Sequence, residues 1–276
     1  MRLGIFAKTF DGTSASAVLA AVAAAGYSTA QYNMACSGLP SMPDEIPAEA
    51  AAAVAAASRR CTVSIAAVSG TYNMIHPDKA VRGQGHRRLE VLASRCKLLS
   101  AGMITLCTGT RDPQDQWRWH RDNDGPGTWR DLLASMETAI AIAERWDVTL
   151  GIEPELANVV SSPERAAVLI SELQSPRLKI VIDPANLFEQ ASLDEQRHIV
   201  ASSIDLLGDR IAMGHAKDRT ADGGFVAAGK GVVDFAHYVA CLKGAGFDGP
   251  MITHGLSAAE APEVAKFLRD AGVDVL

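Results

Sequence analysis

The sequence of 276 residues lacks the usual marks of disulfide-rich, nucleic-acid-binding and membrane proteins. Its five cysteines are widely spaced and form no CxxC motif, which favours reduced thiols over a disulfide framework. Its net charge is −6, whereas a nucleic-acid-binding face is normally basic. The first residues show no signal-peptide pattern, and the alanine-rich run 48–57 is too short to span a membrane. We therefore expect a cytoplasmic protein with neither nucleic acid nor membrane as its partner.

Motifs for nucleotide binding and for serine catalysis are also missing. The segment RGQGHRR at 82–88 is not a GxGxxG fingerprint, and neither a P-loop nor a GxSxG motif occurs. Cys107 ends an apolar run but has no flanking base, so core packing is favoured over nucleophilic catalysis. The chemistry must therefore be sought in other residues.

Short apolar, β-rich runs alternate with longer helical patterns along the chain. The predicted strands are Leu3–Ala7, Ser28–Met34, Thr62–Val68, Met103–Cys107, Val148–Ile152, Leu178–Ile182, Ile211–Gly214 and Pro250–Thr253. The predicted helices are Ser14–Ala25, Pro47–Arg60, Gln84–Ser100, Thr128–Trp146, Pro163–Leu173, Leu193–Leu207, Phe235–Gly244 and Ala258–Ala271. Eight strand–helix units in about 270 residues are typical of a (β/α)8 TIM barrel. The sequence predicts this α/β fold as a single domain over residues 1–276, with a doubly wound open sheet as the alternative.

Polar side chains stand at the ends of the predicted strands. In a (β/α)8 barrel, the C-terminal strand ends meet at one mouth, which carries the active site. Lys8 and Asn33 lie at the first two strand ends. The last four strands end in side chains that ligate divalent metals, namely Glu153, Asp183, His215 and His254. A satisfied polar residue at the rim is the alternative for any one of them, but four in succession favour a metal or acid–base site.

Four segments, in this order, carry a resemblance to a known family. They are GIEPE (151–155), VIDPANLF (181–188), GHAKD (214–218) and AAGKGVVDF (227–235). The ordered set resembles the xylose-isomerase-like TIM barrels, a superfamily of sugar and sugar-phosphate isomerases and epimerases. The resemblance covers essentially the whole chain.

The resemblance implies a divalent metal held by Glu153, Asp183, His215 and a residue on strand eight. Mn²⁺ is the favoured ion, with Mg²⁺, Co²⁺ or Zn²⁺ as alternatives. Many members carry a glutamate on strand eight that is both a ligand and an acid–base group. Here the segment MITHGL offers His254 and no acid. Imidazole is a competent ligand for Mn, Fe or Zn, so His254 is the expected replacement.

The chemistry can also be derived from the residue types. Isomerising a hydroxy-carbonyl sugar removes a proton from the carbon beside the carbonyl, which needs a base and stabilisation of the enediolate charge. A metal that chelates the two oxygens supplies the stabilisation. Glu153 is the predicted ligand and base. His254 is its predicted acid–base partner, because the pKa of a free histidine lies near neutrality.

Several residues near these strand ends are candidates for substrate contact. Glu155 follows the predicted base, and a solvated loop acid is the alternative for it. Asn186 is either a hydrogen-bonding residue or a turn residue. The resemblance suggests a substrate contact for His76, against a plain turn residue before Pro77. Lys217 could bind an anionic substrate group.

Two long segments follow the third and fourth strands, at 76–88 and 108–129. Long loops in a compact barrel are usually functional. Arg111 and His120 lie in the second segment among tryptophans, a combination that suits a sugar face with a phosphate or carboxylate. A loop folded onto its own helices, or a contact surface in a homo-oligomer, is the alternative.

These observations leave several functions open. The first is a metal-dependent isomerase or epimerase of a small carbohydrate or keto-sugar, with an anionic substrate group left open. A keto-sugar lyase or dehydratase begins with the same proton abstraction, and it needs no second base to return the proton. A non-catalytic sugar-binding barrel is a third reading. A nuclease of the same fold is disfavoured by the acidic pI and the sparse ligand set.

Overall fold

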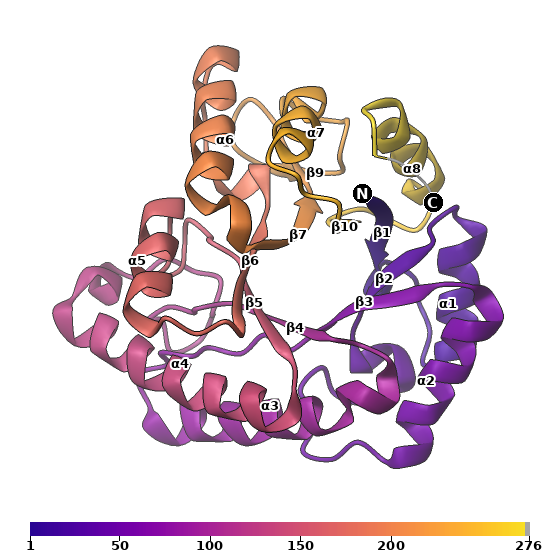
Figure 1. The fold of residues 1–276 in the computed structure, drawn as a ribbon, viewed down its shortest axis with the longest axis horizontal. Helices are drawn as coiled ribbons and strands as arrows, with labels where there is room; N and C mark the ends of the chain where they lie inside the picture. The colour runs from indigo at the N-terminus through magenta and orange to yellow at the C-terminus, as the bar shows by residue number, and fades with distance from the viewer. Residues whose placement is uncertain (274–276) are drawn as a thin grey trace.

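Eight parallel strands close into a barrel in the computed structural model, which describes residues 1–273 (Figure 1). The strands are β1 (Arg2–Phe6), β2 (Thr29–Tyr32), β3 (Ser64–Ser69), β4 (Met103–Leu106), β5 (Thr149–Ile152), β6 (Leu178–Ile182), β7 (Ile211–Ala216) and β10 (Pro250–Thr253). Their order around the barrel is β1-β10-β7-β6-β5-β4-β3-β2. The barrel closes where β1 pairs in parallel with β10. The predicted (β/α)8 fold class is confirmed, and the open sheet is excluded.

Helices surround the strands on the outside of the barrel (Figure 1). They are α1 (Ala15–Ala24), α2 (Ala48–Cys61), α3 (Lys79–Leu99), α4 (Pro126–Trp146), α5 (Pro163–Leu173), α6 (Leu193–Leu207), α7 (Phe235–Gly244) and α8 (Ala261–Asp270). Within the described residues, no helix has the length and apolar character needed to cross a membrane.

The largest boundary error concerns α3, which begins at Lys79 and not at Gln84. The Asp78 side chain accepts a hydrogen bond from the Ala80 N–H at 2.7 Å, so it caps the helix. The segment 76–88 is therefore mostly helical, and the expectation of a long loop there was wrong. Arg88 lies on the surface of this helix and pairs with Asp44.

Two apolar clusters form the core of the protein, one outside the barrel and one inside it. The larger one packs the outer faces of the strands against the helices and includes Ile180 and Ile182 of β6. The smaller one consists of strand residues only, namely Ala67, Met103, Val181, Met213 and Ile252. Alternate residues of a strand face opposite sides, so the second cluster fills the interior of the barrel. We call these five residues the apolar plug. It forms the floor beneath the side chains at the mouth of the barrel.

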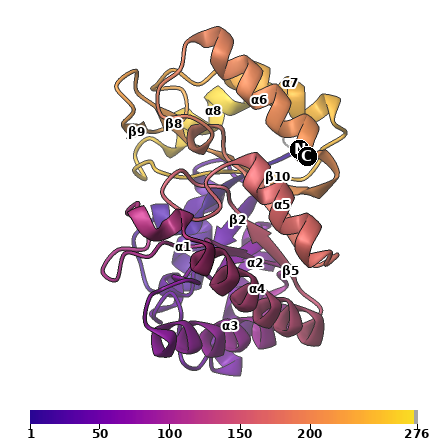
Figure 2. The same ribbon diagram turned by 90° about the vertical axis from the view of Figure 1, so that its left-hand side faces the viewer.

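A short antiparallel hairpin, β8 (Asp218–Arg219) and β9 (Phe225–Val226), was not predicted. It lies on the same side of the molecule as the loop before α4 (Figure 2). The buried Asp218 carboxylate accepts hydrogen bonds from the N–H groups of Gly229, Gly231 and Val233 at 2.9–3.0 Å. Asp218 therefore anchors the backbone of the loop that leads to α7.

Candidate metal and substrate site

The side chains of a strand alternate between its two faces, and this alternation places the candidate ligands inside the mouth of the barrel. Met213 belongs to the interior plug, and His215 follows it two residues later on the same face of β7. The same step of two residues leads from Val181 to Asp183 and from Ile252 to His254. The ligand candidates therefore stand directly above the apolar plug.

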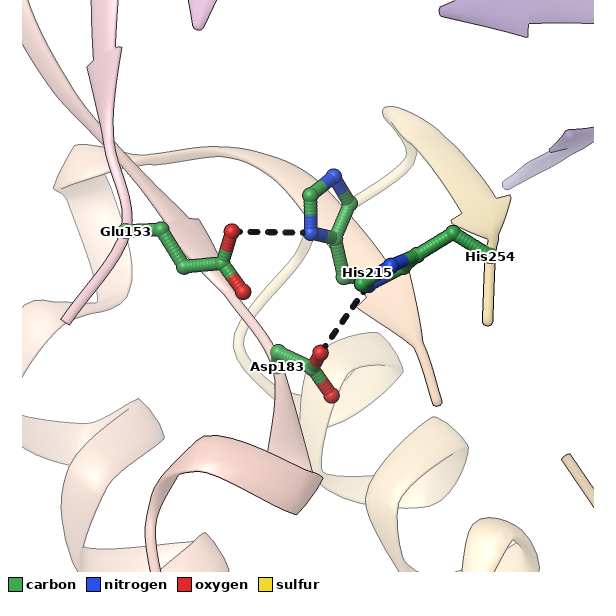
Figure 3. A group of neighbouring side chains, drawn as sticks. All are labelled: Glu153, Asp183, His215 and His254. Atoms are coloured by element: carbon green, nitrogen blue, oxygen red, sulfur yellow. Dashed lines mark hydrogen bonds and ion pairs between the residues drawn. The ribbon is translucent and has the colours of Figure 1, made fainter. Parts of the chain in front are cut away.

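Glu153, Asp183, His215 and His254 lie close together (Figure 3). One carboxylate oxygen or ring nitrogen from each lies within 4.8 Å of those of the others. Glu153 Oε2 is 3.1 Å from His215 Nδ1, and Asp183 Oδ2 is 3.2 Å from His254 Nε2. The two imidazole rings lie with their centroids 4.5 Å apart and their planes tilted by 57°. The arrangement is a compact set of two carboxylates and two imidazoles.

The electrostatics keep both carboxylates charged despite their burial. Burial opposes ionisation of Glu153, but the adjacent His215 outweighs it and lowers the pKa of Glu153. Burial likewise opposes ionisation of Asp183, but Lys217 and His254 hold the pKa of Asp183 well below its usual range. Glu153 and Asp183 raise the pKa of His215 against the effect of burial. The pKa of His254 is lowered, because it is buried beside His215.

The hydrogen bonds of His215 define which of its ring nitrogens can bind a cation. Gln31 donates its amide N–H to Thr105 Oγ1 at 3.2 Å, so its Oε1 faces His215 Nε2 at 2.8 Å. His215 Nε2 therefore carries the hydrogen, and Nδ1 is the nitrogen that faces the cluster. Nδ1 is buried, lies 3.1 Å from Glu153 Oε2 and has no hydrogen-bond partner within residues 1–273.

This donor set fits a divalent cation. A cation would bind His215 through the unprotonated Nδ1, since the ligands of metal sites are deprotonated. Two carboxylates with two imidazoles suit Mn, Fe, Co or Zn. Gln31 is the outer partner that such histidine ligands usually have.

A cavity of about 390 Å³ opens over the cluster and is lined by Glu153, His215 and His254. Its volume lies in the usual range for small-molecule sites. The other walls include Trp117 and the polar residues Lys8, Asn33, Ser41, Ser69 and Thr71. Gln31 was missed by the sequence analysis, although a glutamine inside an apolar strand is a usable signal.

The profile of the family described as "Xylose isomerase-like TIM barrel" matches residues 19–271. The chain belongs to this family. A search of curated proteins found no significant relative. The family resemblance expected from the four sequence segments is confirmed.

Three solved structures share the fold of this chain. The 3-keto-D-glucoside 4-epimerase YcjR of E. coli is 14% identical, with a TM-score of 0.78 over 98% of this chain and 99% of that chain. A D-psicose 3-epimerase of Clostridium cellulolyticum H10 is 14% identical, with a TM-score of 0.76 over 98% and 99%. The IOLI protein "with a binding zinc atom" is 16% identical, with a TM-score of 0.75 over 99% and 98%. At these identities, the likeness shows the shared fold.

Within this family barrel, Asn186 and Lys217 contact the carboxylates of the cluster. Asn186 donates its side-chain N–H to Glu153 Oε1 at 2.7 Å and accepts from Lys217 Nζ at 3.3 Å. Lys217 Nζ also lies 3.7 Å from Asp183 Oδ2 and over the Phe225 ring. Both side chains therefore contact the candidate ligands, and their predicted substrate contacts stay predictions.

Glu155 lies beside the cluster without a hydrogen bond from its carboxyl group to any residue of 1–273. Burial and the charge of Glu153 raise the pKa of Glu155 to about 7. Glu155 is thus a carboxyl group that changes its protonation near neutral pH.

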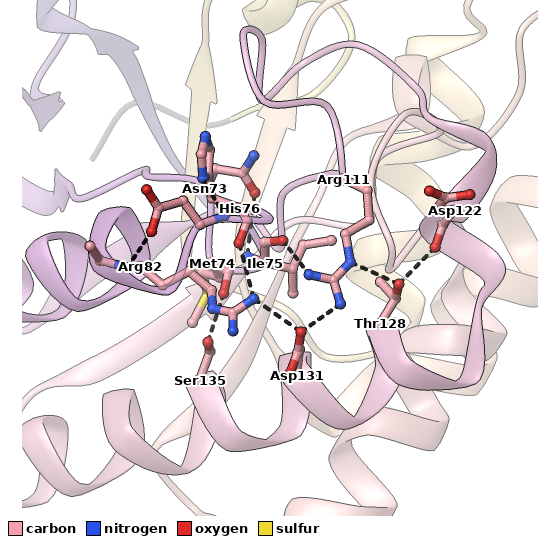
Figure 4. A network of polar contacts seen from close by, with 12 residues as sticks. Asn73, Met74, Ile75, His76, Arg82, Arg111, Asp122, Thr128, Asp131 and Ser135 are labelled. Atoms are coloured by element: carbon pink, nitrogen blue, oxygen red, sulfur yellow. Dashed lines mark hydrogen bonds and ion pairs between the residues drawn. The ribbon is translucent and has the colours of Figure 1, made fainter.

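Arg111 is not brought to the cavity. Its guanidinium donates to Asp131 at 2.5 Å, to Thr128 Oγ1 at 2.9 Å and to the Ile75 carbonyl at 2.9 Å (Figure 4). Arg82 reaches the same Asp131 carboxylate at 3.0 Å. This network joins the loop after β3 to the start of α4, so Arg111 has a structural position and not the expected substrate contact.

His76 and His120 also contact loop backbone, His76 in the loop after β4 as well as in its own loop. His76 lies 3.1 Å from the Pro113 carbonyl through Nε2, and its Nδ1 accepts from the Asp78 N–H at 3.0 Å. His120 Nδ1 accepts from the Asp122 N–H at 3.2 Å and caps a short 3-10 helix. Neither residue lines the cavity above the cluster, so the structure gives no support to a substrate contact by either.

Proposed function

We propose that the protein is a metal-dependent isomerase or epimerase of a small carbohydrate or keto-sugar. The observation that carries the proposal is the convergence of Glu153, Asp183, His215 and His254, three of which (Glu153, His215 and His254) line a sugar-sized cavity. The family and the two epimerases that share the fold support it. The zinc atom named for the IOLI protein, which shares the fold, supports a metal in this chain.

In this proposal Glu153 is a ligand and the base, and Asn186 holds its Oε1 so that the carboxylate keeps one orientation. His254 stands after β10, three strands away from β5 around the barrel, so it faces Glu153 across the lumen. It is both the fourth ligand and the candidate for returning the proton. A bound divalent cation would stabilise negative charge on the substrate oxygens.

The ligand set is tested by metal content, measured by mass spectrometry on protein purified without chelators. We expect about one transition-metal ion per chain, and its loss in Asp183→Ala and in His254→Ala. Asp209→Ala, at an exposed surface carboxylate, is the matched control and should keep the ion. If His254→Ala also keeps the ion, His254 is not a ligand and only its acid–base role remains.

The reaction is tested by uptake of deuterium from D₂O into a panel of keto-sugars. Glu153→Gln should abolish the uptake, because the amide cannot accept the proton. No uptake by wild-type protein loaded with Mn²⁺, Co²⁺ or Zn²⁺, despite sugar binding, would favour the non-catalytic barrel. Mn²⁺ is the proposed ion, and the same reconstitution series compares it with Mg²⁺.

A keto-sugar lyase or dehydratase is the second candidate, because His254 replaces the second carboxylate. Elimination needs no base to return the proton on the opposite face. Product analysis separates the two readings, because a dehydratase product has lost one water. The chain is proposed to be one cytoplasmic domain, since the pairing of β1 with β10 closes a single barrel and the five cysteines are unpaired.

A further inference from the structure

The wall of the cavity formed after β1, β2 and β3 differs from the metal-site wall. It carries Lys8, Asn33, Ser41, Ser69 and Thr71, which offer an ammonium group, an amide and three hydroxyls. None of the hydroxyls of Ser41, Ser69 and Thr71 makes a hydrogen bond within residues 1–273. The metal-site wall, in contrast, carries the Glu153 carboxylate and the imidazoles of His215 and His254.

Asn33 is the most informative of these residues, because it is only 3% exposed. Its Oδ1 accepts a hydrogen bond from the Ala35 N–H at 2.9 Å, which fixes the orientation of the amide. Its NH₂ group is left without a partner in the described part of the chain, and the residue lines the cavity. Ser69 is 4% exposed and is in the same state. Neither the Asn33 amide nor the Ser69 hydroxyl is among the fully buried atoms without a partner, so both groups are open to the cavity and available to a ligand there.

Lys8 adds a charge to this wall. It is the single lysine or arginine among the residues that line the cavity, and it forms no ion pair or hydrogen bond within residues 1–273. Two cations near the other wall are already engaged, since Lys217 contacts Asp183 and Arg219 donates to the Ala185 carbonyl. Lys8 is therefore the cation that remains free to meet a ligand in the cavity.

We propose that Lys8, Asn33, Ser41, Ser69 and Thr71 form an oxyanion subsite, and that the substrate is an acidic sugar. The inference rests on the proposed function, in which the carbonyl end of the sugar lies at the metal-site wall. A lysine ammonium and an amide NH₂ can only donate hydrogen bonds. A carboxylate or phosphate only accepts them when ionised, and charge-assisted bonds to such groups are the strong ones.

Three sugars that differ only at C6 test the subsite by calorimetric titration. They are D-fructose, D-fructuronate and D-fructose 6-phosphate. We expect at least one anionic sugar to bind tenfold or more tightly than D-fructose, a difference of about 1.4 kcal/mol. The preferred anion identifies the substrate group as carboxylate or phosphate. Lys8→Met should remove the preference and Lys8→Arg should keep it.

Lys97→Met is the matched control, because Lys97 is an exposed lysine on α3 outside the cavity. It makes the same change in net charge and should keep the anion preference. Equal binding of all three sugars, no binding of any, or a preference that survives Lys8→Met would overturn the subsite. The titration is run with metal-free and with Mn²⁺-loaded protein. A preference without deuterium exchange would leave the subsite standing and reject the isomerase proposal.

Discussion

Gln31 Oε1 lies 2.8 Å from His215 Nε2, so a side chain of β2 reaches across the barrel to orient one of β7. The two strands are three steps apart in the barrel order. Gln31 is itself oriented by Thr105 on β4. Three strands thus define the tautomer of one imidazole, which turns its Nδ1 toward the two carboxylates.

Replacing this glutamine should weaken metal binding. In Gln31→Leu, the Nε2–H of His215 loses its acceptor and the other tautomer becomes accessible. We expect the affinity for Co²⁺ to fall about 10- to 100-fold, as for other outer partners of histidine ligands. The measurement is a Co²⁺ titration followed by absorption. Gln31→Glu keeps an acceptor and should bind within a few-fold of wild type. Wild-type affinity in Gln31→Leu would show that Gln31 only fills space.

The hydrogen bonds that Asp218 accepts from the loop before α7 should contribute to the free energy of unfolding. Asp218→Ala leaves the N–H groups of Gly229, Gly231 and Val233 without their acceptor. We expect the free energy of unfolding to fall by about 2–4 kcal/mol, since a buried group left unpaired costs about 1–3 kcal/mol and water can reach part of this loop. Urea unfolding measures the change. Asp248→Ala, at an exposed aspartate, should change it by no more than about 0.5 kcal/mol. An equal effect in both variants would reject the anchor.

Arg111 should contribute to stability and not to ligand binding. Its side chain is 14% exposed and makes hydrogen bonds to Asp131, Thr128 and the Ile75 carbonyl. Arg111→Met should lower the free energy of unfolding by about 2 kcal/mol, less than for a fully buried pair because Asp131 is partly exposed. Affinities for metal and for the anionic sugars should stay unchanged in titrations. A selective loss of sugar binding would restore the substrate contact that the sequence predicted.

The same network gives a pH dependence through Asp131. Burial opposes its ionisation, but Arg111 and Arg82 outweigh this and lower the pKa of Asp131. A carboxyl with a lowered folded-state pKa stabilises the protein above its unfolded pKa of about 3.9, and the contribution disappears as the pH falls through the folded-state pKa. Asp131→Asn should therefore be less stable than wild type near pH 7, and the difference should narrow near pH 3. Urea unfolding at both pH values tests this, and a constant difference would contradict it.

The sequence alone determined the barrel and the strand ends. Hydrophobic periodicity and helix formation depend on neighbours in the chain, so the eight strand–helix units could be read directly. Parallel strands all run toward one mouth, which is why Glu153, Asp183, His215 and His254 could be expected near one another. The start of α3 was misread, because a histidine–proline–aspartate segment looks like a loop until Asp78 is seen to cap a helix.

The tertiary structure alone decided what each remaining side chain contacts. Arg111 and His76 stand in segments that suit a sugar site, yet their partners are Asp131 and the Pro113 carbonyl. Gln31 gained its role from a histidine 184 positions away in the chain. A polar side chain takes the partner that the fold brings within about 3 Å, and no local pattern encodes that partner. The sequence therefore determined where a site would form, and the packing of distant strands decided which residues face it.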